Sequence, residues 1–181
     1  KLMADAGYPD GFKMTIHGPN DRYINDAKIA EALAQMLNRV GIDASVETMP
    51  KAVYFKRASR GGPNKSPEFS FMLLGWGAGS GEASSPLKAL LHTYDKSKGM
   101  GAANRGRHTD AKVDALIQKA LATVDADARG KLLAQATEKA VGENYGVIPM
   151  HYQVNTWAAK KGYSYLPRTD ERTIVTGLSG S

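Results

Sequence analysis

Apolar and polar residues alternate in two short stretches near the start of the chain, and a helical pattern lies between them. Residues 12–16 read Phe-Lys-Met-Thr-Ile and residues 42–47 read Ile-Asp-Ala-Ser-Val-Glu, the period-two pattern of half-buried strands. Over residues 27–41, apolar side chains recur every three or four positions and form one helix face. Gly41 is a typical residue for ending such a helix. The first part of the chain therefore predicts strand, helix and strand.

A second helix and a third strand are predicted next. Pro50 opens a short helix that is expected to run to about Ser59, and residues 69–74 form a nearly continuous apolar run. Such a run is typical of a strand covered on both faces, as in the middle of a parallel sheet. Strand–helix–strand–helix–strand makes two right-handed βαβ units. The predicted fold class is therefore α/β, with a mainly parallel βαβαβ sheet flanked by helices.

Two further helices are predicted in the second half of the chain. Thr109 or Asp110 would cap the first of them, and Asp125 or Asp127 would start the second, which ends at Gly142. Both carry one apolar stripe, so we expect an antiparallel pair that covers one face of the sheet.

The two ends of the chain differ from this regular pattern. Leu2–Ala6 reads as the last turn of a helix that Gly7 stops, so we expect the chain to be a piece of something longer. Residues 147–154 have an extended pattern, and residues 162–181 have no helical period and few apolar anchors. A tail of that kind rarely folds by itself, so we expect it to pack on this domain or on a missing one.

Composition narrows the range of functions only a little. The 181 residues carry a formal net charge of +6, from 24 Lys and Arg against 18 Asp and Glu. The basic residues are scattered, which favours a solvated surface; a nucleic-acid-binding alternative would rest on the Arg105 and Arg107 cluster. With no cysteine and four histidines far apart in sequence, we expect neither a metal site nor a cofactor.

The segment with the most candidate chemistry is the Gly-rich loop that follows the third predicted strand, residues 75–85. In open α/β sheets, ligands bind beyond the carboxyl ends of the strands. Alternate glycines let the backbone approach a ligand closely and present its N–H groups. The spacing fits neither a dinucleotide fingerprint, nor a Walker phosphate loop, nor a nucleophile elbow.

Side chains of this loop allow more than one interpretation. Trp76 could be a stacking wall for a ligand or a cap on the core, and Glu82 could receive a cation or be merely solvated. An enzyme alternative, a Gly-rich-loop hydrolase, would use Ser80 or Ser84 with His92, although a sequence provides no geometry for that pair.

The order of these segments resembles a bacterial protein family. The residues that carry the resemblance are Leu2–Phe12, the helix Ala27–Gly41, the strand Phe71–Trp76, the helical Val113–Ile117 and Ile148–Tyr152. They resemble segments of extracytoplasmic solute-binding proteins of the dipeptide, oligopeptide and nickel class (family 5), which are the capture components of ABC importers. The resemblance spans essentially the whole chain, and the order and spacing are more specific than any single motif.

The resemblance implies a two-lobed protein that closes on its ligand like a hinged trap. Residues 1–150 would be a periplasmic-binding-protein-like C-terminal ligand-binding lobe, truncated within its first helix, and residues 151–181 a hinge and return segment that completes a missing N-terminal lobe. The implied function is capture of a peptide or other small polar solute, without catalysis. The implied location is the periplasm, or the cell exterior with a membrane tether. The implied partners are ABC permease subunits, and the isolated lobe could self-associate. The resemblance implies no nucleic-acid partner.

The resemblance also implies a set of ligand-binding residues in the Gly-rich loop. Trp76 would be a wall of the site, the backbone N–H groups of Gly77, Gly79 and Ser80 would be donors, and Glu82 would be a cation partner. In the family's peptide binders an Asp three residues after the Trp holds the peptide's α-amino group, whereas this chain has Gly79 there. Because a buried ammonium needs a paired anion, either Glu82 supplies it from a shifted position or the ligand is not an ordinary peptide.

Overall fold

The sheet is built around β1 (Lys13–Pro19), which has a parallel neighbour on each side. Along one edge, β2 (Asp43–Met49) pairs with it in a register that runs from Lys13 opposite Asp43 to Pro19 opposite Met49. Along the other edge, the N–H of His17 donates to the carbonyl of Phe71 at 3.0 Å, and the N–H of Leu73 donates to the carbonyl of His17 at 2.8 Å. The predicted third parallel strand is therefore present, shortened to one bridge.

Helices α2 (Asp26–Arg39) and α3 (Lys51–Arg60) lie on opposite faces of this sheet. Side chains of a strand alternate between faces, and Phe71 packs with the α2 core whereas Met72 packs with the α3 core. The α2 core contains Ile16, Ala30, Ala34 and Ala44, and the α3 core contains Met49, Tyr54, Ala58 and Phe69. Both helices match the predicted ranges within a few residues, so the βαβαβ prediction is confirmed.

The helix pair α5 (Ala111–Ala122) and α6 (Ala126–Thr137) forms as predicted, but its predicted position against the sheet is wrong. The pair packs on η2 (Leu87–Leu91), a π-helical turn that continues from α4 (Ser84–Pro86), and this makes a third core. The buried residues of that core are Leu87, Leu91, Val113, Ile117, Ala120, Leu133, Ala136 and Ala140. The physical reason is that α2 and α3 already cover both faces of the sheet.

Aspartate caps fix the start of both helices of the pair. The Asp110 carboxylate accepts the N–H groups of Lys112 and Val113, at 2.7 and 3.1 Å. The Asp125 carboxylate accepts the N–H of Ala128 at 2.8 Å. These contacts confirm two of the predicted helix starts, because N-cap side chains satisfy backbone donors that have no partner inside the helix. Helix α6 continues through the π-helical segment η3 (Glu138–Glu143).

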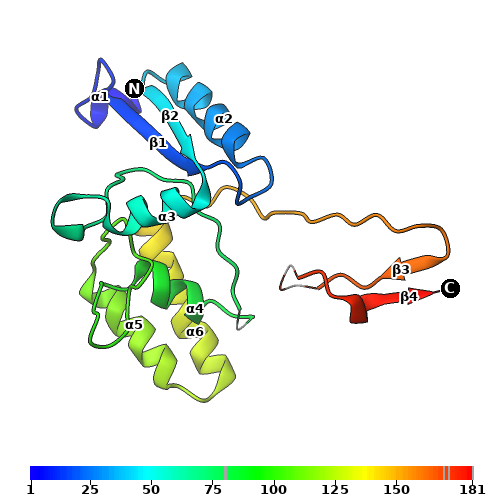
Figure 1. Cartoon of the computed structure of the whole chain (residues 1–181). Helices are drawn as coiled ribbons and strands as arrows, with labels where there is room; N and C mark the ends of the chain where they lie inside the picture. Colours follow the sequence, from blue (N-terminus) through cyan, green and yellow to red (C-terminus); the bar gives the residue numbers. More distant parts are fainter. Residues whose placement is uncertain (80, 169, 171, 181) are drawn as a thin grey trace.

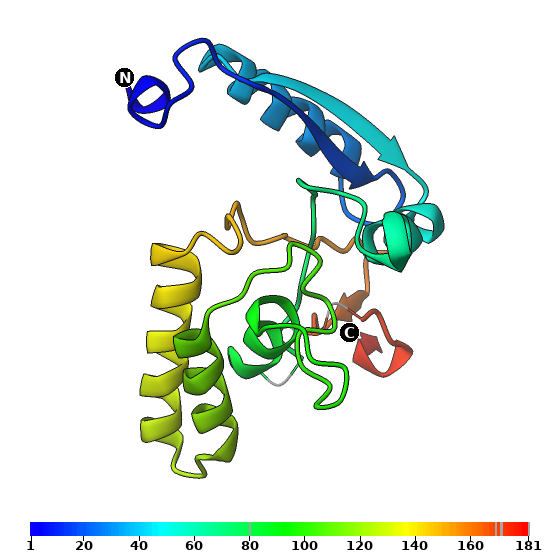
Figure 2. The ribbon, with the colours of Figure 1, turned by 90° about the vertical axis from the view of Figure 1, so that its left-hand side faces the viewer.

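The computed structural model describes residues 1–79, 81–168, 170 and 172–180, which fall into three parts (Figure 1). We call residues 13–74 the sheet unit, residues 83–146 the helical unit and residues 147–180 the C-terminal arm. Figure 2 shows the sheet unit stacked on the helical unit when the molecule is turned by 90°. Short elements complete the list: α1 (Leu2–Asp5), η1 (Pro63–Lys65), β3 (Tyr163–Tyr165), η4 (Val175–Gly177) and β4 (Leu178–Gly180).

The C-terminal arm extends away from the two units. Its first part is irregular and exposed, and β3 and β4 then pair as a short antiparallel hairpin (Figure 1). Large apolar side chains of the arm face solvent, with Tyr152 97% exposed and Val154 77% exposed. Among the described residues of the arm none is buried. No strand is assigned to residues 147–154, for which an extended segment was predicted. The tail was expected to pack on this domain or on a missing one; among the described residues of the arm, Val147 contacts the core of the helical unit, whereas Tyr152 and Val154 face solvent.

One close backbone contact joins the start of β1 to the turn before β2. Gly11 has φ +76°, and a Cβ placed on it would lie 1.7 Å from the carbonyl oxygen of Gly41. This approach leaves room for no side chain, which explains a glycine at that position. In the described part of the chain, no helix combines the length and the apolar character needed to span a membrane.

Candidate functional site

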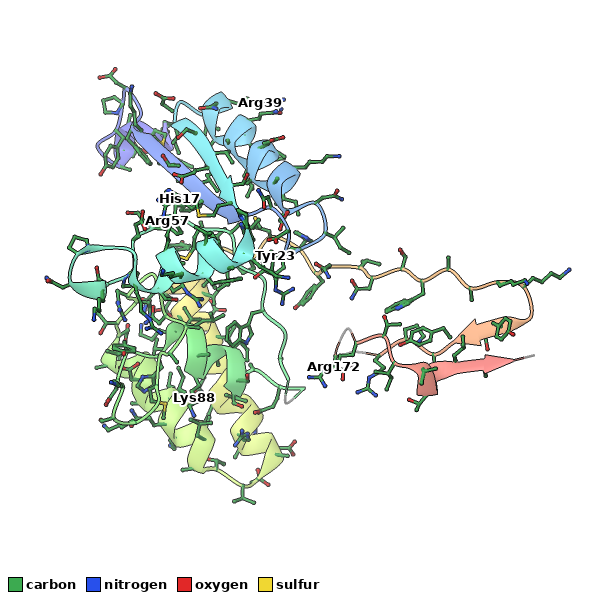
Figure 3. All side chains as sticks on the ribbon, in the orientation of Figure 1. His17, Tyr23, Arg39, Arg57, Lys88 and Arg172 are labelled. Carbon is green, nitrogen blue, oxygen red and sulfur yellow. The ribbon has the colours of Figure 1, made fainter. Side chains whose placement is uncertain are left out.

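Two loops meet at the carboxyl ends of β1 and of the third parallel segment. Residues 20–25 follow β1, and the Gly-rich loop follows Leu74. Tyr23 from the first loop donates its hydroxyl hydrogen bond to the carbonyl of Gly75 at 3.3 Å. A Cβ on Gly75 would lie 2.7 Å from the Tyr23 ring, so the ring packs directly on that glycine. Figure 3 shows Tyr23 at this end of the sheet.

Trp76 and the glycines after it present an open surface. The Trp76 side chain is 45% exposed, and a Cβ on Gly77 or Gly79 would meet no atom within 4 Å. Within the described residues, the N–H groups of Gly77 and Gly79 have no hydrogen-bond partner. The structure thus brings together three of the predicted site residues, whereas Ser80 lies outside the described residues.

Arg22 and Tyr23 belong to the same surface, and sequence reasoning missed both. The Arg22 guanidinium lies over the Tyr23 ring, 4.9 Å from its centroid. No ion pair of Arg22 is found in the part of the chain that the structure describes. Their place in the sequence could have predicted them, because a polar loop directly after the first parallel strand lies at the same edge of the sheet as the Gly-rich loop after the third. We call Arg22, Tyr23, Gly75, Trp76, Gly77 and Gly79 the strand-end surface.

Glu82, near the end of the Gly-rich loop, forms an ion pair with Arg129 of the same chain. Its carboxylate accepts two hydrogen bonds from Arg129 of α6, from Nε at 2.9 Å and from Nη2 at 2.8 Å, and one from the Ser84 hydroxyl. Hydrogen bonding by Arg129, and then by Ser84, lowers the pKa of Glu82 to about 2. Arg129 also donates from Nη1 to the carbonyl of Ala120 at 3.1 Å. Glu82 therefore ties the loop to the junction of α5 and α6.

Of the residues of the hydrolase alternative, Ser84 and His92 are not arranged as a nucleophile and its base, and Ser80 lies outside the described residues. The Ser84 hydroxyl donates to Glu82. His92 is buried, with Nδ1 2.7 Å from the carbonyl of Thr93 and Nε2 3.0 Å from Nε2 of Gln118. The carbonyl requires a proton on Nδ1, so the Nε2 lone pair accepts from the Gln118 amide. His92 thus has an internal partner at each nitrogen and is not poised to take a proton from Ser84.

Arg105 and Arg107, the basic pair on which the nucleic-acid alternative rests, contact different aromatic side chains. Arg105 donates to the Ser59 hydroxyl at 3.1 Å and lies 5.4 Å from the Phe55 ring centroid. Arg107 lies 4.6 Å from the ring centroid of Tyr94. Each guanidinium stacks on its own ring, and this arrangement does not make a continuous basic stripe.

Two other features bear on where a ligand could sit. Among the described residues, no group of three His, Cys, Asp or Glu side chains is placed to hold a metal ion. An open hollow lies in the arm, between the segment before β3 and the hairpin, and its lining includes Trp157, Tyr163, Tyr165 and Leu178. The lining of this hollow shares no residue with the strand-end surface, so the two are separate candidate sites.

Known proteins resemble this chain over most of its length. Heme-binding protein A of Haemophilus influenzae is 29% identical over 142 residues, covering 75% of this chain and 24% of that protein. The structure of HbpA2 from Haemophilus parasuis aligns with a TM-score of 0.77 at 26% identity, over 99% of this chain and 34% of that one. The structure of Haemophilus influenzae OppA in complex with RPPGFSPFR aligns with a TM-score of 0.70 at 25% identity, over 90% of this chain and 30% of that one.

The chain thus spans about a quarter of the first of these relatives and about a third of the other two. The alignments establish the periplasmic-binding-protein fold that the sequence predicts for this α/β lobe. Residues 1–98 match the family described as bacterial extracellular solute-binding proteins, family 5 Middle. Because that match takes in more than half of the residues, the chain belongs to the family 5 bacterial extracellular solute-binding proteins.

Proposed function

We propose that this chain supplies one wall of the solute site in the capture component of an ABC importer. Residues 1–150 would be the ligand-binding lobe, and residues 151–181 a segment that returns toward a first lobe. The support is family membership together with relatives that bind heme and, in the case of OppA, the peptide RPPGFSPFR. The site would lie outside the cytoplasm, in the periplasm or on a tethered protein, with permease subunits as partners.

The observation that carries the proposal is the strand-end surface. It offers an aromatic plane in Trp76, open N–H donors in Gly77 and Gly79, and a guanidinium in Arg22. Small-molecule sites combine apolar or aromatic walls with a few placed polar groups in this way. In the proposed site Ser80 contributes a further N–H donor, as the sequence predicts. Glu82 now holds the loop in place through Arg129.

The proposed chemistry is recognition without a covalent step. A binding site needs only aromatic planes, donors and charges, and each of these is present at the strand ends. The alternative enzyme would need Ser80 or Ser84 activated by His92, and the Ser84 hydroxyl and both ring nitrogens of His92 have other partners. We therefore propose a binding protein in preference to a hydrolase.

The test is a titration of the 181-residue chain with hemin and with the peptide RPPGFSPFR acetylated at its amino terminus. In a Trp157→Phe background Trp76 is the remaining tryptophan, so hemin should quench its fluorescence, and the peptide should shift its indole N–H in NMR spectra. Trp76→Ala should weaken binding at least about fivefold in isothermal titration calorimetry, which does not need the indole as a reporter, because aromatic contacts contribute on the order of 1 kcal/mol. The control Tyr152→Ser, in the exposed arm, should leave binding unchanged.

Affinity provides a second criterion for the same proposal. A solute held by one wall keeps much of its surface in water, so we expect dissociation constants no tighter than about 10 µM. Perturbations confined to the hollow of the arm would contradict the proposal, as would the absence of any response to both probes. Nanomolar binding by this chain alone would contradict the two-lobed arrangement.

A further inference from the structure

The Gly-rich loop carries a single charged side chain, Glu82, and its carboxylate is engaged in contacts within the protein. Between Gly75 and Ala83 only Glu82 is ionisable. Two hydrogen bonds from Arg129 and one from Ser84 engage its carboxylate. Two parallel N–H bonds from one guanidinium are among the strongest side-chain contacts in proteins.

A ligand ammonium would therefore have to displace Arg129 in order to reach Glu82. The two side chains are only 27% and 30% exposed, so the displaced guanidinium would lose its anion in a partly desolvated place. Arg129 would also remain held at the carbonyl of Ala120, 3.1 Å from Nη1. Displacement of the pair is thus unfavourable, and the strongly lowered pKa of Glu82 reflects the same tight contact.

Other charges at the strand ends favour the same type of ligand group. Two carboxylates near Arg22 accept backbone donors: Asp21 of the loop after β1 from the N–H of Lys51 at 2.6 Å, and buried Asp26, the first residue of α2, from the N–H groups of Arg22 and Tyr23 at 2.9 and 3.0 Å. The Arg22 guanidinium, by contrast, is exposed on the Tyr23 ring. A ligand at this surface meets N–H donors and a cation before it meets an available anion.

We propose that Arg129 is a specificity-determining residue, which neutralises Glu82 and so makes the strand-end surface accept neutral or anionic solute groups and reject a free ammonium. Arg129 acts through Glu82 and the loop and does not itself need to touch the solute. The proposal rests on the proposed function, because it names the class of solute group that the same surface accepts.

The test compares two probes that differ in one charge, tri-alanine and N-acetyl-tri-alanine. Binding to the 181-residue chain is measured from the Trp76 indole N–H shift, with the acetylated probe expected to bind at least as tightly as the free amine. Arg129→Gln should release the Glu82 carboxylate and move the affinity ratio toward the free amine by about fivefold or more. The matched control Arg168→Gln breaks an ion pair with Asp170 in the arm and should leave the ratio unchanged.

Glu82→Gln provides an independent arm, useful if Arg129→Gln does not fold. The amide keeps an acceptor for Arg129 and removes the anion, so the ratio should stay at the wild-type value. The proposal is overturned if the wild-type chain prefers the free amine about tenfold and Glu82→Gln abolishes that preference, or if a folded Arg129→Gln leaves the ratio unchanged. If hemin, acetylated RPPGFSPFR and both tripeptides all fail to bind, the proposed function falls and takes this inference with it.

Discussion

The third parallel segment of the sheet unit and the α5–α6 pair of the helical unit are held in place by different kinds of contact. In the sheet unit, buried Tyr54 donates its hydroxyl to the carbonyl of Leu73 at 2.7 Å, and the carbonyl of His17 lies 3.4 Å away. The core between α5, α6 and η2 encloses aliphatic side chains and close-packed alanines. The difference teaches that the position of the third parallel segment depends on directed hydrogen bonds, whereas the helix pair depends on side-chain volume.

Directed polar contacts also join the elements of the sheet unit at its surface, in an ion-pair cluster around Arg57. Arg57 of α3 lies between two carboxylates, with Nη1 2.6 Å from Glu47 and Nε 3.0 Å from Glu68. Hydrogen bonds from Arg57 lower the pKa of both carboxyl groups. Figure 3 shows Arg57 and His17 together between the sheet and α3. These polar contacts join β2, α3 and the segment leading to the third strand.

The largest effect should come from a cavity in the helical unit. Ile117→Ala removes a fully buried side chain and should destabilise that unit by about 3 kcal/mol. Hydrogen exchange followed by mass spectrometry should then show faster exchange in α5 and α6, with β1 and β2 unaffected. Val124→Ala, at a position 97% exposed, is the matched control and should change stability by less than about 0.5 kcal/mol. Equal loss of protection in both units would show that they unfold as one.

A smaller effect is expected from removing one hydroxyl in the sheet unit. Tyr54→Phe leaves the buried carbonyl of Leu73 without its donor and should cost about 1–2 kcal/mol in free energy of unfolding. Burial raises the pKa of Tyr54, so its hydroxyl stays protonated and donates at neutral pH. Amide exchange of His17 and Leu73, whose N–H groups make the bridge between β1 and the third parallel segment, should rise most. Tyr23→Phe, which loses an exposed 3.3 Å contact, is the control; an equal cost for both variants would contradict the argument.

The smallest effect concerns the ion pair between Glu82 and Arg129, which links the Gly-rich loop to the helical unit. The pKa of Glu82 is about 2 in the folded chain, below its ordinary value of 4.5. A depressed carboxyl pKa stabilises the fold fully above the unfolded value, and this contribution is lost as pH falls from about 4.5 through about 2. Chemical denaturation across that range should show a shallower acid loss for Glu82→Gln than for wild type. Parallel pH profiles of the two chains would contradict the assignment.

Elements with a strong local pattern could be predicted from the sequence. The alternation of residues 12–16 and 42–47, the apolar stripe of α2 and the Asp caps of α5 and α6 fix each element within a few residues. The helix pair was misplaced because periodicity tells which face is apolar and not which surface covers it. Residues 84–91 supplied that surface, and their short pattern gave no sign of it.

The sequence predicted only those parts of the candidate site that lie next to a predicted strand along the chain. The Gly-rich loop and Trp76 come directly after an apolar strand, which places them at a strand end. Arg22 and Tyr23 reach the same place from a loop more than 50 residues earlier, through the Tyr23 contact with Gly75. The pairing of Glu82 with Arg129 spans 47 residues, and no local pattern announces it.

The short third strand also has a consequence for the order of assembly. Contacts between α5 and α6 are local in sequence, and local contacts form fast; a parallel sheet must first close two crossovers, which is slow. During synthesis, however, the slow sheet unit leaves the ribosome before the fast helical unit. We expect the earlier synthesis of the sheet unit to offset its slower folding, so that both units reach their folded state at about the same time. We expect the bridge between His17 and Met72 to close late, because it joins residues 55 positions apart, and the Gly-rich loop that follows it to take its shape afterwards.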